Sequence, residues 1–149
     1  MNLEDIMSKN LVVMNKDSLI DEVGEVMYKY DMGFIPISEK NKIIGVVTDR
    51  DIATKVVGNN DTKIESYITR DLITIGFDST LEEVIDLMGQ KKIKRLLVEK
   101  DSKLVGIISF ADLLNTDIDN ELILKNLRKI YEINRNSDTY ITGVDEFVL

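Results

Sequence analysis

Apolar residues in the first third of the chain follow two spacings, which predict alternating strands and helices. Short continuous runs of apolar and β-branched residues, bounded by polar turns, are typical of strands. Such runs occupy residues 11–14, 34–37 and 43–48. Between the first two runs, Ile20, Val23 and Met27 recur three or four residues apart, which is the spacing of a buried helical face. A short helix predicted at 49–57 completes the order strand, helix, strand, strand, helix.

Three local patterns add detail to these elements. Ser18 and Ser79 each have an acid three residues later, and so match the capping box that satisfies N–H groups at a helix start. Pro36 lies within a predicted strand, and because proline cannot donate to a ladder we expect an edge strand or a strand end there. The runs 43–48 and 104–109 are uninterrupted, which predicts strands buried on both faces.

The chain repeats itself with an offset of 61 residues, which aligns residues 6–53 with 67–114 without a gap. The identical pairs are Leu11/Leu72, Asp17/Asp78, Ser18/Ser79, Glu22/Glu83, Val23/Val84, Met27/Met88, Lys42/Lys103, Gly45/Gly106 and Asp51/Asp112. The second copy predicts strands at 72–75, 96–98 and 104–109, with helices after Ser79 and at 110–114. This ungapped match indicates a duplicated β-α-β-β-α unit.

The repeat and its flanks divide the chain into four parts and place it in the α/β (α+β) fold class. These parts are a first repeat at 1–57, a polar linker at 58–66, a second repeat at 67–115, and a C-terminal helix and tail at 116–149. In the last part, apolar residues at helical spacing predict an amphipathic helix over 119–133, and they are Ile123, Leu127, Ile130 and Tyr131. This stripe must be buried, either against its own chain or against a second copy.

Composition narrows the chemistry that this chain can perform. Its 149 residues are 44% hydrophobic and 31% charged, which is typical of a folded protein rather than a disordered one. The sequence has no cysteine and no histidine, which excludes thiol nucleophiles, Ser-His-Asp triads, disulfides and Cys/His zinc sites. Any catalysis would depend on carboxylates, lysines, tyrosines or hydroxyls.

Charge and hydropathy bear on partners and location. The chain has 19 basic and 27 acidic residues, and its formal charge of −8 argues against general binding to nucleic acid or to an anionic membrane. No apolar run approaches the roughly 18 residues of a membrane-spanning helix. Residues 1–5 carry acids where a signal peptide carries bases. We therefore expect a soluble, cytoplasmic protein.

The most specific pattern is an apolar strand with a central glycine, followed by Thr/Ser-x-x-Asp at a helix start. In the two copies it comprises Gly45, Thr48 and Asp51, and Gly106, Ser109 and Asp112. The glycine lets another backbone or a ligand approach the strand. The hydroxyl can cap the helix or help its N–H groups to hold a phosphate, and the acid can favour the helix dipole or bind ribose hydroxyls. The recurrence in both copies favours the ligand interpretation.

On these residues the chain resembles tandem CBS domains, the cystathionine β-synthase-type repeats that form a Bateman module. The glycine-to-aspartate pattern, the strand at 35–37 and the β-α-β-β-α order all match, over about residues 6–114. The run Thr-Asp-Arg-Asp at 48–51 is similar to that of stand-alone bacterial CBS-pair proteins. The resemblance implies two repeats packed about a pseudo-twofold axis, with two clefts that commonly hold AMP, ADP, ATP or S-adenosylmethionine.

The resemblance also implies which residues line each cleft. In one cleft, Ser109 would contact phosphate, Asp112 ribose, and Ile107 would be an apolar wall, with the adenine enclosed by Ser8, Val13, Met32 and Gly33. The other cleft would use Val46, Thr48, Arg50 and Asp51, closed by Thr69, Thr74, Ile93 and Lys94. Leu97 stands where the family usually has the proline seen at Pro36, which puts the shape of the adenine wall in the second repeat in doubt.

A cluster of basic residues supports binding of an anion. Six of the 19 bases fall within residues 91–103, and they are Lys91, Lys92, Lys94, Arg95, Lys100 and Lys103. A local basic patch can hold an anion on an acidic chain, although a solvated turn with surface lysines is the alternative. Lys94 and Arg95 stand at a predicted strand start. They resemble the basic pair that nucleotide-sensing members, such as the γ subunit of AMP-activated kinase, direct at phosphates.

The resulting hypothesis is a regulatory module, not an enzyme, that senses an adenosine nucleotide or S-adenosylmethionine and signals to an effector protein by conformational change. This function requires no cofactor or metal, and the resemblance implies a homodimer. Two alternatives stay open. One is an interaction module with vestigial clefts. The other is a Mg²⁺-dependent nucleotide hydrolase using Asp49 with Asp51 or Asp117 with Asp119, which is disfavoured because acids two apart do not share a helix face.

Overall fold

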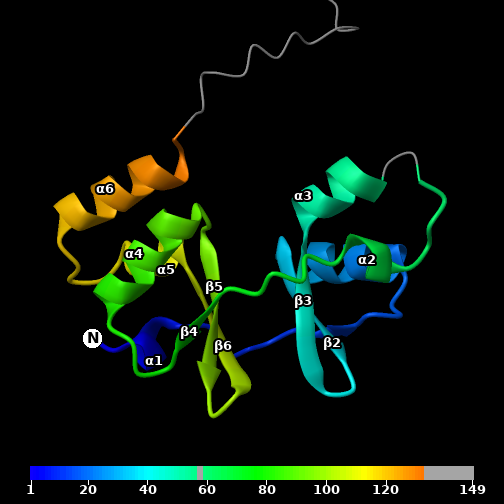
Figure 1. Ribbon diagram of the computed structural model, residues 1–149, viewed down its shortest axis with the longest axis horizontal. Coiled ribbons are helices and arrows are strands. Elements are labelled where there is room, and N and C mark those ends of the chain that lie inside the picture. The colour runs from blue at the N-terminus through cyan, green and yellow to red at the C-terminus, as the bar shows by residue number, and fades with distance from the viewer. Residues whose placement is uncertain (57–58, 133–149) are drawn as a thin grey trace, which may run out of the picture.

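The computed structural model describes residues 1–56 and 59–132, within which the repeats form two three-stranded sheets that lie side by side (Figure 1). The first repeat comprises β1 (Met14–Asn15), α2 (Ile20–Tyr30), β2 (Phe34–Glu39), β3 (Lys42–Thr48), α3 (Asp49–Asp51) and the π-helical turn η1 (Ile52–Val56). Its sheet has the order β1-β2-β3, with β1 parallel to β2 and β2 antiparallel to β3. The helix α2 makes the crossover that two parallel strands need.

The second repeat has the same order. It comprises β4 (Thr74–Gly76), α4 (Leu81–Lys91), β5 (Arg95–Lys100), β6 (Lys103–Ser109) and α5 (Phe110–Leu113). Its sheet β4-β5-β6 is again parallel and then antiparallel. The register shift between Ile37 and Ser38 recurs between Val98 and Glu99, which are 61 residues further on. The predicted β-α-β-β-α duplication and the α/β (α+β) class are therefore confirmed.

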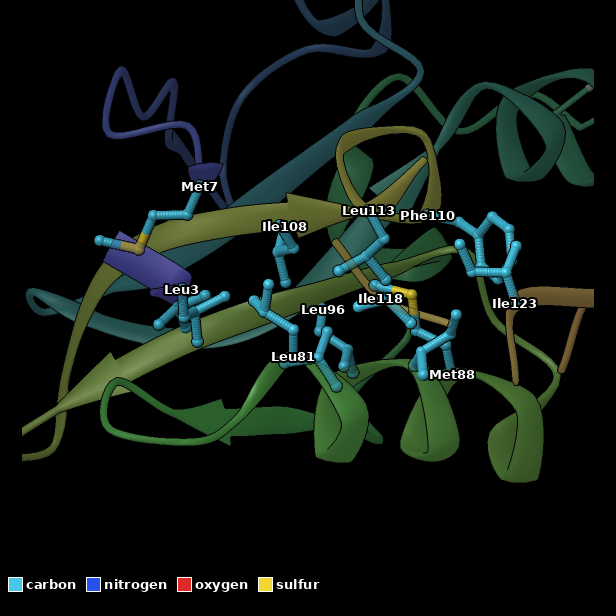
Figure 2. Close-up of a cluster of buried hydrophobic side chains, with 13 residues drawn as sticks. Leu3, Met7, Leu81, Met88, Leu96, Ile108, Phe110, Leu113, Ile118 and Ile123 are labelled. Atoms are coloured by element: carbon cyan, nitrogen blue, oxygen red, sulfur yellow. The ribbon is translucent and has the colours of Figure 1, made fainter. Parts of the chain in front are cut away.

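The segment at the start of each repeat packs in the hydrophobic core of the other repeat. The helix α1 (Leu3–Ile6) begins the first repeat, yet Leu3 and Met7 are buried among the core side chains of the second (Figures 1 and 2). Conversely, both ends of the 3₁₀ turn η2 (Ile64–Tyr67), which precedes β4, are buried in the core of the first repeat. The exchange is reciprocal, as a pseudo-twofold relation requires, so each packed core contains residues from both copies.

Two isolated backbone bridges continue this exchange. Ser8 and Ile107 exchange hydrogen bonds of 2.8 and 3.0 Å, and Thr69 and Val46 exchange two of 2.9 Å. A Cβ at Gly45 would lie 2.6 Å from the carbonyl oxygen of Thr69, so a side chain there would block the passing segment. Approach of another backbone, one of the two reasons predicted for this glycine, is therefore confirmed.

Both long repeat helices begin one residue later than the capping boxes predict. The N-cap of α4 is Thr80, whose hydroxyl accepts a hydrogen bond from Glu83 N (3.2 Å), while the Glu83 carboxylate accepts one from Thr80 N (2.9 Å). In α2 the N-cap is Leu19, and the Glu22 carboxylate accepts from Leu19 N (2.8 Å). The assignment of the two serines as caps is wrong because each serine N–H closes the turn that precedes its helix.

The third strand of each repeat is buried on one face only, so the prediction of two buried faces is wrong. Gly45 and Val47 of β3 are buried, as are the equivalent residues of β6, and the residues between them are half-buried. The half-buried face of β3 carries Val46 and Thr48, which border a cavity rather than the core.

Pro36 lies in β2, which is the central strand of its sheet, so the expected edge-strand position is wrong. Its neighbour on β3, Val46, directs both backbone groups to Thr69, and pairing of β2 with β1 starts only at Ile37. The proline therefore sits where neither neighbouring strand needs a donor. The equivalent residue Leu97 does pair, with Thr74, and β4 accordingly starts one repeat position earlier than β1.

The predicted amphipathic helix is confirmed as α6 (Asn120–Ile130), which packs on α4 (Figure 1). Of its apolar stripe, Ile123 is buried and Leu127 and Ile130 pack against the second core, whereas Tyr131 is 59% exposed. The stripe is therefore buried against its own chain. Residue 133 and the tail beyond it lie outside the described residues.

A buried asparagine fixes the position of α6 on α4. Asn126 is fully buried, and its amide donates to Asp86 Oδ1 (2.9 Å) and to the carbonyl of Leu122 (3.1 Å). Its Oδ1 accepts from Lys129 Nζ (3.2 Å). Gly89 on α4 makes the room, because a Cβ there would lie 2.8 Å from Asn126 Cγ. A satisfied polar group in an apolar contact favours one register over others, since sliding would leave it unpaired.

Candidate ligand-binding site

The two strand-to-helix junctions share one hydrogen-bonded geometry. Thr48 Oγ1 accepts from Asp51 N (3.1 Å), and Asp51 Oδ2 accepts from Thr48 N (3.0 Å) and Thr48 Oγ1 (2.8 Å). The corresponding distances between Ser109 and Asp112 are 3.3, 2.8 and 2.6 Å. The capping interpretation of the hydroxyl and the acid is therefore realised at both junctions. Any contact with a ligand would be made in addition to this role.

Asp51 also binds a lysine. Lys55 Nζ lies 2.6 Å from Asp51 Oδ1, and the side chain of Asp51 is only 14% exposed. Burial by itself raises the pKa of this carboxyl, but the hydrogen bonds from Lys55 and Thr48 outweigh it and hold the pKa below the ordinary value of 3.8. The carboxylate is thus charged at neutral pH, with both oxygens accepting hydrogen bonds from the protein.

A cavity of about 460 Å³ beside Thr48 is lined by residues of both repeats. Its walls come from β3, the start of α3, the segment 69–73 and the turn between α4 and β5. Val46, Ile73, Ile93 and Leu97 form apolar parts of the wall. The volume lies within the range of about 300–1,000 Å³ that is usual for small-molecule sites. We call this space the Thr48 cavity.

The structure brings together most residues predicted for the cleft of Asp51. The predicted residues that line the Thr48 cavity are Val46, Thr48, Arg50, Thr69, Ile93, Lys94 and Arg95. Asp51 and Thr74 do not line it, because Asp51 is engaged with Lys55 and Thr74 lies in β4, paired with Leu97. Gly33, predicted for the other cleft, lines this cavity and lies close to the Asp49 carboxylate.

Sequence reasoning missed other parts of the lining. They are Phe34, Asp49, Asp71, Leu72, Ile73 and Lys92. Lys92 belonged to the basic cluster but was not assigned to a cleft. Residues 71–73 are carried to the cavity by the bridge between Thr69 and Val46, so their proximity depends on contact between the repeats. Their position just after Thr69 was the available clue.

The remaining residues predicted for the cleft of Asp112 lie outside the Thr48 cavity. Ser8 and Ile107 face each other in their backbone bridge, next to the cap formed by Ser109 and Asp112. Val13 is 39% exposed ahead of β1, and Met32 packs on the first core.

A second cavity, of about 330 Å³, lies where the chain start meets the first turn of α4. It contains none of the residues predicted for either cleft. Within residues 1–56 and 59–132, no group of three acids is placed to hold a metal ion. No helix in the same ranges is long and apolar enough to cross a membrane.

A family model for the CBS domain matches the chain twice, over residues 3–58 and 64–119. The chain belongs to the CBS domain family. Its two repeats form a CBS pair, which is a regulatory module, and the resemblance found in the sequence is confirmed. Each match begins at an exchanged leading segment, and α6 starts immediately after the second match.

Curated relatives include both stand-alone CBS pairs and larger proteins. The CBS domain-containing protein YhcV of Bacillus subtilis is 28% identical over 123 residues, covering 80% of this chain and 88% of its own. Inosine-5′-monophosphate dehydrogenase of Methanocaldococcus jannaschii is 26% identical over 74% of this chain, but the match spans only 22% of that enzyme. The CBS pair is therefore used both alone and as part of a larger chain.

Solved structures of CBS pairs are similar to this chain. The CBS domain pair of protein MJ0100, in complex with 5′-methylthioadenosine and S-adenosyl-L-methionine, has a TM-score of 0.69 and 28% identity over 76% of this chain and 93% of its own. An uncharacterized conserved protein from Pyrococcus horikoshii has a TM-score of 0.69 and 30% identity over 76% of this chain and 89% of its own.

The lining of the Thr48 cavity is more basic than the residues that are equivalent to it by the repeat. Four bases line the Thr48 cavity, together with Asp49 and Asp71. With the 61-residue offset, the bases Arg50, Lys92, Lys94 and Arg95 correspond to Ala111, Asp31, Gly33 and Phe34. A pseudo-twofold relation between the repeats places those four residues at the equivalent positions, and it also places Lys94 and Arg95 at the positions equivalent to Gly33 and Phe34. The equivalent positions therefore carry two bases instead of four, because Ala111 and Asp31 stand where the Thr48 cavity has Arg50 and Lys92.

Proposed function

We propose that this CBS pair binds one adenosine nucleotide per chain, in the Thr48 cavity, and signals its presence by a conformational change. The observation that carries the proposal is the basic lining of this cavity, which has four bases where the equivalent positions of the repeat have two. Phosphate oxygens gain strong, charge-assisted hydrogen bonds from lysine and arginine, so a phosphorylated ligand favours the basic cleft over its counterpart. Because the chain is acidic as a whole, this basic lining attracts anions locally, while the net charge of the chain repels them.

The rest of the lining suits an adenosine group. Val46, Ile73, Ile93 and Leu97 offer apolar surface for a flat base. The complex of MJ0100 with S-adenosyl-L-methionine and 5′-methylthioadenosine supports an adenosine moiety as the common part of such ligands. For this chain, the four bases disfavour the sulfonium cation of S-adenosylmethionine and favour phosphates.

The backbone holds the two central bases in place. Arg95 opens β5 and pairs with Ser109, and the carbonyl of Lys94 accepts a hydrogen bond from Phe110 N (2.8 Å). The backbone of both residues is therefore fixed, which reduces the conformational entropy lost when their side chains bind a ligand.

We assign the ribose contact to Asp51, which does not line the Thr48 cavity while its Oδ1 is bound to Lys55. Its Oδ1 now accepts from Lys55, whose side chain is 52% exposed, so a ribose hydroxyl could replace that lysine without disturbing the cap between Asp51 and Thr48. The cap argues against the hydrolase that would use Asp49 with Asp51, because Oδ2 of Asp51 is committed to Thr48 and only Oδ1 is left for Mg²⁺.

Calorimetry with a matched pair of arginine variants tests the proposal. Arg95→Ala should weaken ATP binding about ten- to a hundredfold, because hydrogen bonds to the phosphates are lost, and should weaken adenosine binding far less. Arg128→Ala removes an equal charge from an exposed position on α6 and should leave both affinities unchanged. ATP should bind with a stoichiometry of one per chain.

Three results would contradict the proposal in different ways. Equal loss of ATP and adenosine affinity in Arg95→Ala would mean that this arginine supports the fold rather than the phosphates. Two equivalent ATP sites per chain would refute the charge argument. Failure of AMP, ADP, ATP, adenosine and S-adenosylmethionine to bind would favour the interaction module with vestigial clefts, and turnover of bound ATP would favour the hydrolase.

A further inference from the structure

The end of α6 contacts two of the bases that line the Thr48 cavity. Lys92 Nζ forms an ion pair with Glu132 Oε2 at 3.0 Å, and Lys94 Nζ lies 5.5 Å from the centre of the Tyr131 ring. Glu132 and Tyr131 directly follow α6, beyond the region matched by the CBS domain model. This chain therefore carries, outside its CBS repeats, a carboxylate and an aromatic ring that already occupy part of the cationic lining.

We infer that Glu132 competes with ligand phosphates for Lys92, so that a phosphorylated ligand releases the residues that follow α6. The inference rests on the proposed nucleotide site and adds its regulation. Lys92 and Lys94 would change partners, from Glu132 and Tyr131 to phosphate oxygens. Adenosine, which has no phosphate, would occupy the same cavity and leave both contacts intact.

The exposure of the ion pair makes such an exchange feasible. The side chains of Lys92 and Glu132 are 49% and 67% exposed. An ion pair in this setting is well solvated and contributes little to stability, so a ligand with several negative charges can displace a single carboxylate. A cation–π contact at 5.5 Å on an exposed tyrosine is likewise weak.

The rest of α6 is anchored, which confines the response to its end. Ile123 and Asn126 are buried against α4, with Asn126 hydrogen-bonded to Asp86. After Ile130, the described contacts of the chain with the cavity are those made by Tyr131 and Glu132. Residues 133–149 follow directly in the sequence, so the release acts on the point from which the tail begins.

Two glutamate variants, one just after the end of α6 and one in its first turn, measure the competition. Glu132→Gln keeps the shape and removes the charge, and should tighten ATP binding about two- to fivefold because ATP no longer displaces an ion pair. Adenosine affinity should not change. Glu121→Gln removes an exposed acid from the first turn of the same helix and should leave both affinities unchanged. Melting temperatures equal to that of the unmodified chain would show that both variants are folded.

A fluorescent reporter measures the release. The chain has no tryptophan, so Tyr131→Trp provides a single indole that keeps an aromatic ring over Lys94. Saturating ATP should shift its emission, and saturating adenosine should not. In the same background, Lys92→Ala should weaken ATP binding more than adenosine binding.

The outcomes separate this inference from the nucleotide site itself. If ATP binds with one site per chain but Glu132→Gln leaves its affinity unchanged and the indole emission does not respond, the competition is refuted and the nucleotide site stands. If neither ATP nor adenosine binds the unmodified chain, the site and its regulation both fail. An equal emission shift with ATP and adenosine would also refute the phosphate-dependent release.

Discussion

Two glycines in corresponding repeat helices give opposite predictions for the same substitution. Gly24 lies in α2 and Gly89 in α4, and both helices have 11 residues. A Cβ at Gly24 would meet open space, whereas a Cβ at Gly89 would meet Asn126 of α6. Gly24→Ala should therefore raise the free energy of unfolding by about 0.5–1 kcal/mol, because alanine loses less conformational entropy than glycine on entering a helix.

For Gly89→Ala, the same gain is opposed by a clash. The new Cβ would lie 2.8 Å from Asn126 Cγ and 3.0 Å from Asn126 Cβ, and Asn126 is fully buried and hydrogen-bonded to Asp86. Overpacking of this kind costs about 1–3 kcal/mol. After the helix-propensity gain of about 0.5–1 kcal/mol is subtracted, the free energy of unfolding should fall by up to about 2.5 kcal/mol.

Equilibrium urea unfolding, followed by circular dichroism, measures both changes. A constant m-value would show that the variants differ in stability and not in the surface exposed on unfolding. Gly89→Ala should cost less in an Asn126→Ala background, because the clashing amide is gone. Stabilisation by both alanines, or an unchanged cost in that background, would refute the docking of α6 through this contact.

Three further predictions concern the repeat contact, pH and assembly. Gly45→Ala should lower the free energy of unfolding by about 2 kcal/mol or more, since its Cβ meets the Thr69 carbonyl, whereas Gly76→Ala, with its nearest contact at 3.5 Å, should change it little. The lowered pKa of Asp51 stabilises the fold above pH 3.8, and this contribution is lost as the pH falls through the folded pKa, so Asp51→Asn should lose less stability in acid titrations below pH 3.8. Sedimentation of the full chain should show a homodimer, and a monomer at micromolar concentration would contradict it.

Local patterns were sufficient to predict the order of elements and the motif at each junction. A strand is recognisable from a short apolar run and a helix from three- to four-residue spacing, because each element buries one face whatever its neighbours are. The same holds for Thr48 and Asp51, whose hydrogen bonds span three residues. Capping was less well predicted: Ser18 matches the pattern, but its N–H closes the preceding turn, and Leu19 becomes the N-cap.

Contacts between distant segments needed the folded chain. Nothing near Leu3 in the sequence indicates that it is buried in the second repeat, and the need for glycine at Gly45 has a defined cause only once Thr69 lies beside it. The ion pair between Lys92 and Glu132 joins residues 40 positions apart, each of which lies just after the end of a different helix. Such pairs depend on how complete elements pack, and packing free energy is summed over many residues, so short-range patterns carry no information about which partners meet.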